Sequence, residues 1–248
     1  MTKQEKITYA KKSVAAAIGH NVDIFEQDKN LFIQSGDGDS FFTLINFGST
    51  AVIIADKAIL DWCINKFAYV PGNEITKGEN LSLLQSKLRE YNKEILDDYL
   101  DISFMRLDKH TGNPAAKEHN DYEFEIYEKD RLAELDKFYE EQIFSQALDE
   151  GRKELLAIVA RKDGEIVAVA SCSAGYKEAF WCINVDTLIN YRGAGLATHL
   201  VAKIAAEIES RGHIPLYTTW ETNAASMHVA SATGFEPVWL WCWVFDTE

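Results

Sequence analysis

Two glycines flank an alanine directly after an arginine in the segment Arg192-Gly193-Ala194-Gly195-Leu196-Ala197. Residues 180–187, just before it, have the composition of a strand, and residues 195–211 have the apolar spacing of a helix. The first turn of a helix leaves backbone N–H groups without partners, and glycine lets an anion approach them closely. An arginine guanidinium is well suited to phosphate. The segment therefore predicts an anion site where a strand passes into a helix.

The composition limits the classes of partner. The chain has 248 residues and a net charge of -14, which argues against a general binder of nucleic acid or of anionic membranes. The polar N-terminus is not followed by an apolar run of signal length, and no stretch approaches the ~20 apolar residues that span a bilayer. We therefore expect a cytoplasmic protein that binds neither nucleic acid nor membrane.

The four cysteines are far apart and have no paired spacing, which predicts neither a disulfide framework nor a metal site. They are interpreted as small buried apolar residues: Cys63, Cys172, Cys182 and Cys242.

The first half of the chain mixes helices with short strands. Apolar spacing predicts helices over 4–18, 56–67 and 81–96, and strands over 41–46, 51–54 and 99–107. Residues 108–120 contain Gly, Asn, Pro and several charges, which is typical of a linker. We therefore place a domain boundary there, between an α+β domain at 1–120 and a second domain at 121–248.

The second half has a more regular order of elements. Strands are predicted over 122–127, 155–160, 165–173, 180–187, 214–220 and 237–245, the last fully buried, and helices over 131–148, 195–211 and 224–233. Asp163-Gly164 predicts a hairpin, Asn223 can cap the last helix and Gly234 can end it.

This order, together with three motifs, resembles the GNAT superfamily of acyl-CoA-dependent N-acyltransferases. Arg192 to Ala197 is similar to the pyrophosphate signature Arg/Gln-x-x-Gly-x-Gly/Ala, Asn223 falls at the helix-opening Asn, and Gly234-Phe235 matches a Gly-Phe pair. The resemblance covers 121–248. Within the superfamily, the chain is similar to a bacterial subgroup that has an extra N-terminal domain. It implies a three-layer α/β/α arrangement of the α+β class, with a mixed and mostly antiparallel sheet.

The resemblance implies acetyl-CoA as co-substrate and a small-molecule amine as acceptor. The pyrophosphate would bind the N–H groups of Gly193, Ala194, Gly195, Leu196 and Ala197, with Arg192 nearby. The main-chain groups of Thr187, Leu188 and Ile189 would hold the pantetheine and polarise the thioester carbonyl, and Asn223 and Ser226 would contact the pantetheine arm. No cysteine has a recognisable nucleophile setting, so we expect direct transfer in a ternary complex.

One position departs from the family pattern. Many GNAT enzymes carry a tyrosine seven residues after the helix-opening Asn, as the acid for the departing thiolate; here that residue is Ala230. The acid is then another group (Ser226, His228 or Tyr217), water, or absent. The missing tyrosine acid matters less because a thiol has a pKa of about 8.5, which makes thiolate a tolerable leaving group.

Carboxylates could take the proton that the attacking amine loses. Asp186 and Glu178, near the two ends of the strand at 180–187, are candidate bases, as is Glu221 after the next strand. The alternative interpretation of each, as a solvated surface carboxylate, is the default for this residue type. Residues 121–150 hold eleven Asp/Glu and three Lys/Arg, so this segment either draws cationic amines or is a solvated surface.

Several rival interpretations are weighed against this one. A dinucleotide fold would need Gly at 198, where the chain has Thr, and a P-loop would need Gly-Lys-Ser/Thr after its glycines. Ala230 motivates an alternative from another class, a catalytically silent acyl-CoA-binding or regulatory module. The sequence allows a homodimer.

Overall fold

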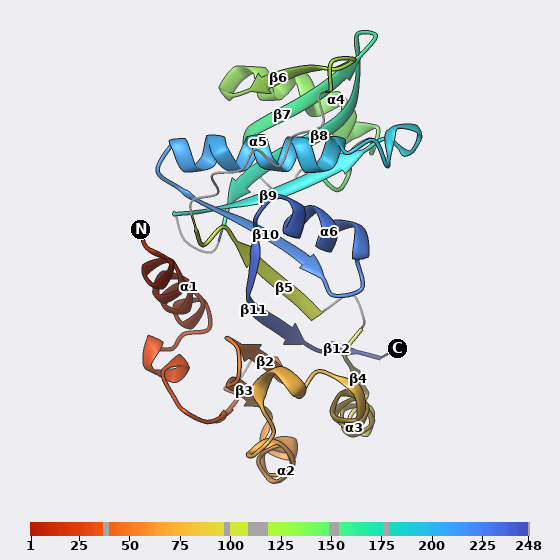
Figure 1. Cartoon of the computed structure of the whole chain (residues 1–248). Helices are drawn as coiled ribbons and strands as arrows, with labels where there is room; N and C mark the ends of the chain where they lie inside the picture. The colour runs from red at the N-terminus through yellow and green to blue at the C-terminus, as the bar shows by residue number, and fades with distance from the viewer. Residues whose placement is uncertain (37–39, 97–99, 109–118, 149–153, 176–178, 248) are drawn as a thin grey trace. The chain divides into compact units, whose positions relative to one another are not determined.

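The computed structural model describes residues 1–36, 40–96, 100–108, 119–148, 154–175 and 179–247. The chain divides into two compact units (Figure 1). Unit 1 contains Met1–Ser103, Thr219–Ala224 and Pro237–Glu248, and unit 2 contains Phe104–Thr218 and Ala225–Glu236. The predicted linker at 108–120 lies mostly outside the described residues, so the boundary at residue 120 stays a prediction.

Unit 1 is built on four neighbouring strands in the order β1-β3-β2-β11. The strands are β1 (Leu31–Gln34), β2 (Phe42–Asn46), β3 (Ala51–Ala55) and β11 (Glu236–Trp243). β1 pairs with β3 in parallel, whereas β2 pairs with β3 and with β11 in antiparallel fashion. The C-terminal strand therefore adds to a sheet made by the N-terminal part of the chain.

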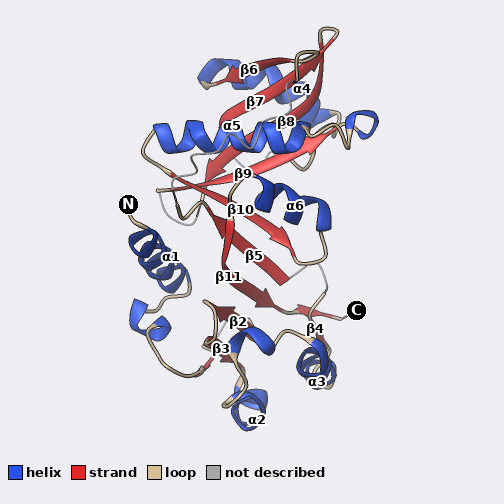
Figure 2. Ribbon diagram, viewed as in Figure 1, coloured by secondary structure: helices blue, strands red, loops and turns tan. Residues whose placement is uncertain are grey.

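Helices α2 (Lys57–Phe67) and α3 (Gly78–Arg89) cover one face of this sheet (Figure 2). Side chains alternate along each strand, so Phe42, Leu44 and Ile53 join the core with Ile59 and Leu84 of the helices. The unit also contains α1 (Lys3–Ala17), η1 (Val22–Phe25), η2 (Gly72–Glu74), β4 (Lys93–Glu94) and β12 (Phe245–Asp246).

Unit 2 contains the strands in the order β10-β9-β8-β7-β6, all antiparallel except for the parallel pair β9 and β10. They are β6 (Glu123–Tyr127), β7 (Glu154–Lys162), β8 (Glu165–Ala174), β9 (Phe180–Thr187) and β10 (Ile214–Trp220, whose last two residues belong to unit 1). Strand β5 (Leu100–Met105) has residues in both units.

Helices cover both faces of the unit 2 strands. The long helix α5 (Leu196–Ser210) crosses β7, β8 and β9 and buries its apolar side against them (Figure 1). The 3₁₀ helix η4 (Lys129–Leu135) and α4 (Asp136–Glu140) lie on the other face, where Tyr127, Phe144 and Val159 belong to one core cluster. The short turn η5 (Ile189–Tyr191) precedes α5, and α6 (Ala224–Ala232) precedes β11. The structure is a mixed α+β fold with a mostly antiparallel sheet, as predicted.

Three element predictions need correction. The helix expected over 131–148 is only η4 and α4, because Gln142 and Phe144 have φ of 54° and 59° and break the helical path. The helix expected over 81–96 ends at Arg89, before Asn92 with φ of 55°. The last strand is only partly buried, since Pro237 is exposed.

Candidate functional site

Strands β9 and β10 separate partway along their length. They pair from Phe180 opposite Ile214 as far as Ile183 opposite Tyr217, and no further pairs follow among the described residues. β9 itself continues to Thr187 and stays paired with β8 throughout, up to Ala168 opposite Thr187. The end of β9 therefore has a free edge on the side from which β10 has departed.

The hydrogen-bond pattern shows which backbone groups face that edge. The N–H of Gly175, just after β8, donates to the carbonyl oxygen of Phe180, and the N–H of Leu188, just after β9, donates to that of Val167. The even-numbered residues of β9 therefore exchange hydrogen bonds with β8. The odd-numbered residues point the other way. Val185 is odd-numbered and lies beyond the last pair with β10, so its N–H and C=O face the free edge. Sequence reasoning missed Val185, although the alternation along 180–187 could have identified it.

Most of the main-chain groups predicted to hold the pantetheine already have partners. The N–H of Thr187 donates to Asp186 Oδ1 at 2.8 Å, and its carbonyl oxygen accepts from Arg192 Nε at 3.0 Å. The N–H of Leu188 donates to Val167 O at 2.9 Å, and the carbonyl oxygen of Ile189 accepts from the N–H of Arg192. The roles of Thr187, Leu188 and Ile189 toward a thioester stay predictions. The Thr187 hydroxyl is buried and has no hydrogen-bond partner in the described part of the chain.

Asp186 connects the end of β9 to the loop that follows it. Its two carboxylate oxygens accept hydrogen bonds from the backbone N–H groups of Thr187 and Gln146, the latter at 3.4 Å. Oδ1 also lies 3.6 Å from an Nη of Arg192. These contacts favour a role in holding the loop; the assignment of Asp186 as a base stays a prediction.

The loop from Arg192 to Gly195 leads into α5 with two residues in the left-handed region. Gly193 has φ of 78°, and Gly195, the N-cap of α5, has φ of 88°. Among the described residues no partner is found for the backbone N–H groups from Gly193 to Thr198; the first helical bond runs from His199 to Gly195 at 3.0 Å. A Cβ at Gly193 would meet no atom within 4 Å, so open space lies above the backbone there. This is the cradle expected of an anion site.

The charge near this cradle is also positive. The Arg192 side chain is 63% exposed, so its guanidinium can turn toward a ligand at the start of α5. His199, one turn inside the helix, stacks on Phe124 at 4.3 Å, and burial together with Lys203 and His119 lowers its pKa to about 4. Its ring is neutral at physiological pH. The helix terminus and Arg192 therefore supply the positive charge expected of an anion site.

The remaining predicted residues come from the strand–helix segment after α5. Asn223 directly precedes α6, and its N–H donates to Trp220 O at 3.1 Å. Ser226 is partly exposed and hydrogen-bonds with the buried phenol of Tyr217. His228 is exposed on α6. Glu178 lies outside the described residues.

Ala230 lies one turn after Ser226 on α6 and is completely buried. Its carbonyl oxygen accepts from the N–H of Phe235 at 3.0 Å, which ties the end of α6 to the start of β11. A methyl group cannot donate a proton, so the side chain at this position contributes packing.

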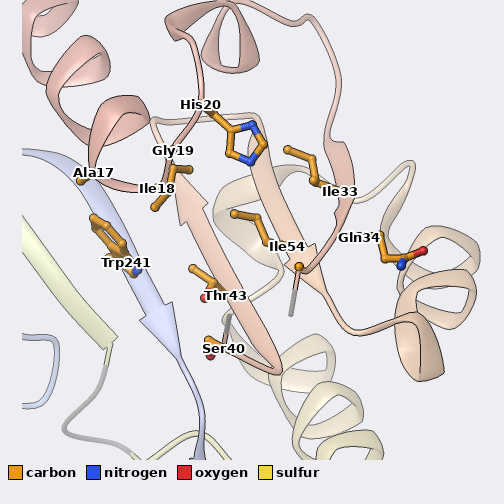
Figure 3. Close-up of a pocket in the computed structure, with 11 residues that line it drawn as sticks. Ala17, Ile18, Gly19, His20, Ile33, Gln34, Ser40, Thr43, Ile54 and Trp241 are labelled. Carbon is orange, nitrogen blue, oxygen red and sulfur yellow. The ribbon is translucent and has the colours of Figure 1, made fainter. Parts of the chain in front are cut away.

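A cavity of about 610 Å³ lies in unit 1 (Figure 3). Its wall combines the end of α1 and the residues after it with residues of β1, β2, β3 and β11, and includes His20, Thr43, Ile54 and Trp241. Ile54 and Thr43 have the opposite strand parity to Ile53 and Phe42, so the cavity lies over the sheet face that α2 and α3 leave uncovered. It contains none of the predicted site residues.

Within the described ranges, no three His, Cys, Asp or Glu side chains are grouped to hold a metal ion. Nor does any described helix have the length and apolar character needed to cross a membrane. The four cysteines are free; three are buried and Cys182 is partly exposed.

Comparisons with solved structures give similarities at low identity. A GCN5-related N-acetyltransferase-like protein from Streptococcus suis is 16% identical, with 96% of this chain and 99% of that chain covered and a TM-score of 0.47. A GCN5-related N-acetyltransferase from Kribbella flavida is 17% identical over 66% and 64%, with a TM-score of 0.45. A GNAT-family acetyltransferase from Novosphingobium aromaticivorans is 15% identical over 63% and 68%, with a TM-score of 0.44.

No curated protein matches the sequence. The sequence profile of one family, described as GNAT acetyltransferase, matches residues 113–241, which is more than half of the chain and includes β9, the glycine loop, α5 and α6. The chain belongs to the GNAT acetyltransferase family.

Proposed function

We propose that this protein transfers the acetyl group of acetyl-CoA to the amine of a small molecule, by direct attack in a ternary complex. The observation that carries the proposal is the row of unpartnered N–H groups from Gly193 to Ala197, beside the exposed guanidinium of Arg192. In this proposal these groups bind the pyrophosphate. Asn223 and Ser226 contact the pantetheine arm.

The free edge of β9 supplies the next part of the proposal. The N–H of Val185 faces this edge and is fixed by a strand that is paired with β8 on its other side. A rigid N–H donor beside a thioester carbonyl stabilises the oxyanion that forms when an amine attacks. The backbone of Val185 is therefore added to that of Thr187, Leu188 and Ile189 as a candidate contact.

The attacking amine must lose a proton, because alkyl amines have a pKa of about 10. Asp186 and Glu178 remain candidate bases. Each carboxylate oxygen of Asp186 already accepts one backbone hydrogen bond, and its remaining lone pairs leave it able to accept a proton in this proposal.

We further propose that the acceptor is cationic. The acidic segment 121–150 includes Glu125 and Glu128, which are paired with Arg131, Arg161 and Arg211. These pairs neutralise part of its charge, and the carboxylates outside them leave a negative balance. Polyamine or aminoglycoside acceptors should then show a higher kcat/KM than neutral amines, with an advantage that decreases as salt is added. Equal kcat/KM values with no salt dependence would remove this part of the proposal.

The test of the main proposal measures two quantities on the same protein. CoA binding is followed by calorimetry, and CoA release from acetyl-CoA is followed with a panel of primary amines. Binding together with amine-dependent release supports the enzyme. Tight CoA binding without turnover on any amine supports the second candidate, a silent acyl-CoA-binding module, which the buried methyl group of Ala230 favours. Absence of CoA binding would overturn both.

A further inference from the structure

Tyr217 is the last residue of β10 that pairs with β9, opposite Ile183. Its side chain is 3% exposed, and its ring packs against Phe235 with the ring centroids 5.9 Å apart. Phe235 follows α6, and its N–H donates a hydrogen bond to the carbonyl oxygen of Ala230. The phenol of Tyr217 therefore reaches from the point where the two strands separate toward α6.

The hydroxyl of Tyr217 forms a hydrogen bond with the side chain of Ser226 in the first turn of α6. Tyr217 is buried, whereas Ser226 is partly exposed. The two hydroxyls form a short chain from the interior to the surface of unit 2. Because a hydroxyl both donates and accepts hydrogen bonds, such a chain can pass a proton along it.

We propose that Tyr217 and Ser226 form a proton relay that protonates the departing thiolate of CoA. This inference rests on the proposed acetyl transfer. As the amine nitrogen bonds to the acetyl carbon and the carbon–sulfur bond breaks, Ser226 gives its hydroxyl proton to sulfur and takes the proton of Tyr217. The phenolate regains a proton from water through Ser226 after the thiol leaves. The proton lost by the amine goes to water or to a carboxylate.

The surrounding side chains favour this pair over the other groups. Ser226 and Ala230 are four residues apart and share one face of α6, and the methyl group of Ala230 has no proton to give. His228 is exposed on the same helix. Burial raises the pKa of Tyr217, so the phenol is protonated at neutral pH and gives up its proton only as the thiolate forms.

The test compares Tyr217→Phe, Ser226→Ala and the double variant with the wild type, in CoA release at saturating acetyl-CoA and amine. Each single variant should lower kcat by about 10- to 100-fold, at or below the lower end of the range for general acid catalysis, because thiolate is already a tolerable leaving group. The double variant should lose no more than the worse single variant, because the two hydroxyls act as one unit. The solvent deuterium isotope effect on kcat should shrink in all three.

Tyr69→Phe is the matched control, because the Tyr69 side chain is fully exposed in unit 1. It should leave kcat and the isotope effect unchanged. Tyr217→Phe should lower Tm by only about 2 to 4 °C, as loss of one hydrogen bond predicts, and leave the Kd of CoA within about twofold.

Wild-type kcat and an unchanged isotope effect in both single variants would overturn the relay while leaving the acetyl transfer intact. Losses that multiply in the double variant would also overturn it, since they would show independent roles. A wild-type protein that transfers no acetyl group to any amine would overturn the proposed function, and the relay with it.

Discussion

The Nε of Arg192 donates a hydrogen bond to the carbonyl oxygen of Thr187 at 3.0 Å, and this bond does not use the two Nη groups of the guanidinium. One Nη lies 3.6 Å from Asp186, and the side chain as a whole is largely exposed. The hydrogen bond to Thr187 thus orients the Arg192 cation beside the glycine loop. A planar guanidinium held at one edge can still contact a phosphate with the other.

Arg192→Ala should therefore weaken CoA binding by about 10-fold, at the lower end for a charge-assisted hydrogen bond because the site is open to water. Arg192→Lys should restore only part of the affinity. Calorimetric titration with CoA measures the change, and Arg89→Ala, an exposed arginine on α3, is the control. Equal Kd values for wild type and Arg192→Ala would remove Arg192 from the site.

A second prediction separates the backbone role of Gly193 from its ligand role. Gly193 and Gly212 have nearly the same φ, 78° and 82°, and a Cβ at either position would meet no atom within 4 Å. Alanine at each should cost about 1 kcal/mol of unfolding free energy, because only the left-handed conformation is penalised.

Their effects on CoA binding should differ. Gly193→Ala places a methyl group in the open space beside the loop that leads into α5, whereas Gly212 lies beyond the other end of that helix. We expect about 10-fold weaker CoA binding for Gly193→Ala and no change for Gly212→Ala. Chemical denaturation and calorimetry on the same preparations give both quantities. Equal losses of CoA affinity in Gly193→Ala and Gly212→Ala would show that the substitutions act on folding alone.

His199 gives a prediction about stability and pH. Its pKa falls from 6.5 to about 4 on folding, mainly through burial and next through Lys203 and His119. Between these two values the unfolded chain binds a proton that the folded protein does not, so this group makes stability fall as the pH is lowered through 6.5 toward 4. Because the ring is partly exposed, we expect this group to lower the free energy of unfolding by about 1 kcal/mol when the pH falls from 7.5 to 5.

His199→Gln should remove that contribution. Urea unfolding at the two pH values gives the measurement, and the difference between them should be smaller in the variant than in the wild type. The same difference in both proteins would show that His199 ionises equally in the folded and unfolded chains.

The strand–loop–helix core of the site could be predicted from the sequence. Strand 180–187 and the glycine loop before α5 are where the pattern places them, because local alternation and glycine conformations determine both. The partners of Thr187 and Leu188 could not be predicted, since they come from Val167, Asp186 and Arg192 through strand register and side-chain geometry. For the same reason the sequence did not reveal the contact between Tyr217 and Ser226.

The fold was predictable where periodicity is strong. α5 spans 15 residues with one apolar side, and its predicted and observed ends differ by one residue. The segment 131–148 has comparable apolar spacing but breaks at Gln142 and Phe144, since the packing of Phe144, Ala147 and Leu148 into the core overrides helical preference. Pairing of β11 with β2 joins residues about 200 positions apart, and no local pattern carries that information.

Asp101, on β5 in unit 1, is a half-buried carboxylate whose pKa burial raises from 3.8 to about 6. Burial, and next the charge of Asp101, raises the pKa of the Cys242 thiol. With a raised folded pKa, the acid stabilises the fold below pH 3.8, and that contribution is lost as pH rises through 6.

Asp101→Asn should thus stabilise the protein by about 1 to 2 kcal/mol at pH 8, after allowance for partial exposure, and hardly at all at pH 4. Urea unfolding at both pH values measures this, with Asp61→Asn on the exposed side of α2 as the control for the amide substitution. Loss of stability at pH 8 in Asp101→Asn would instead show that the ionised carboxylate has a favourable partner in the folded protein.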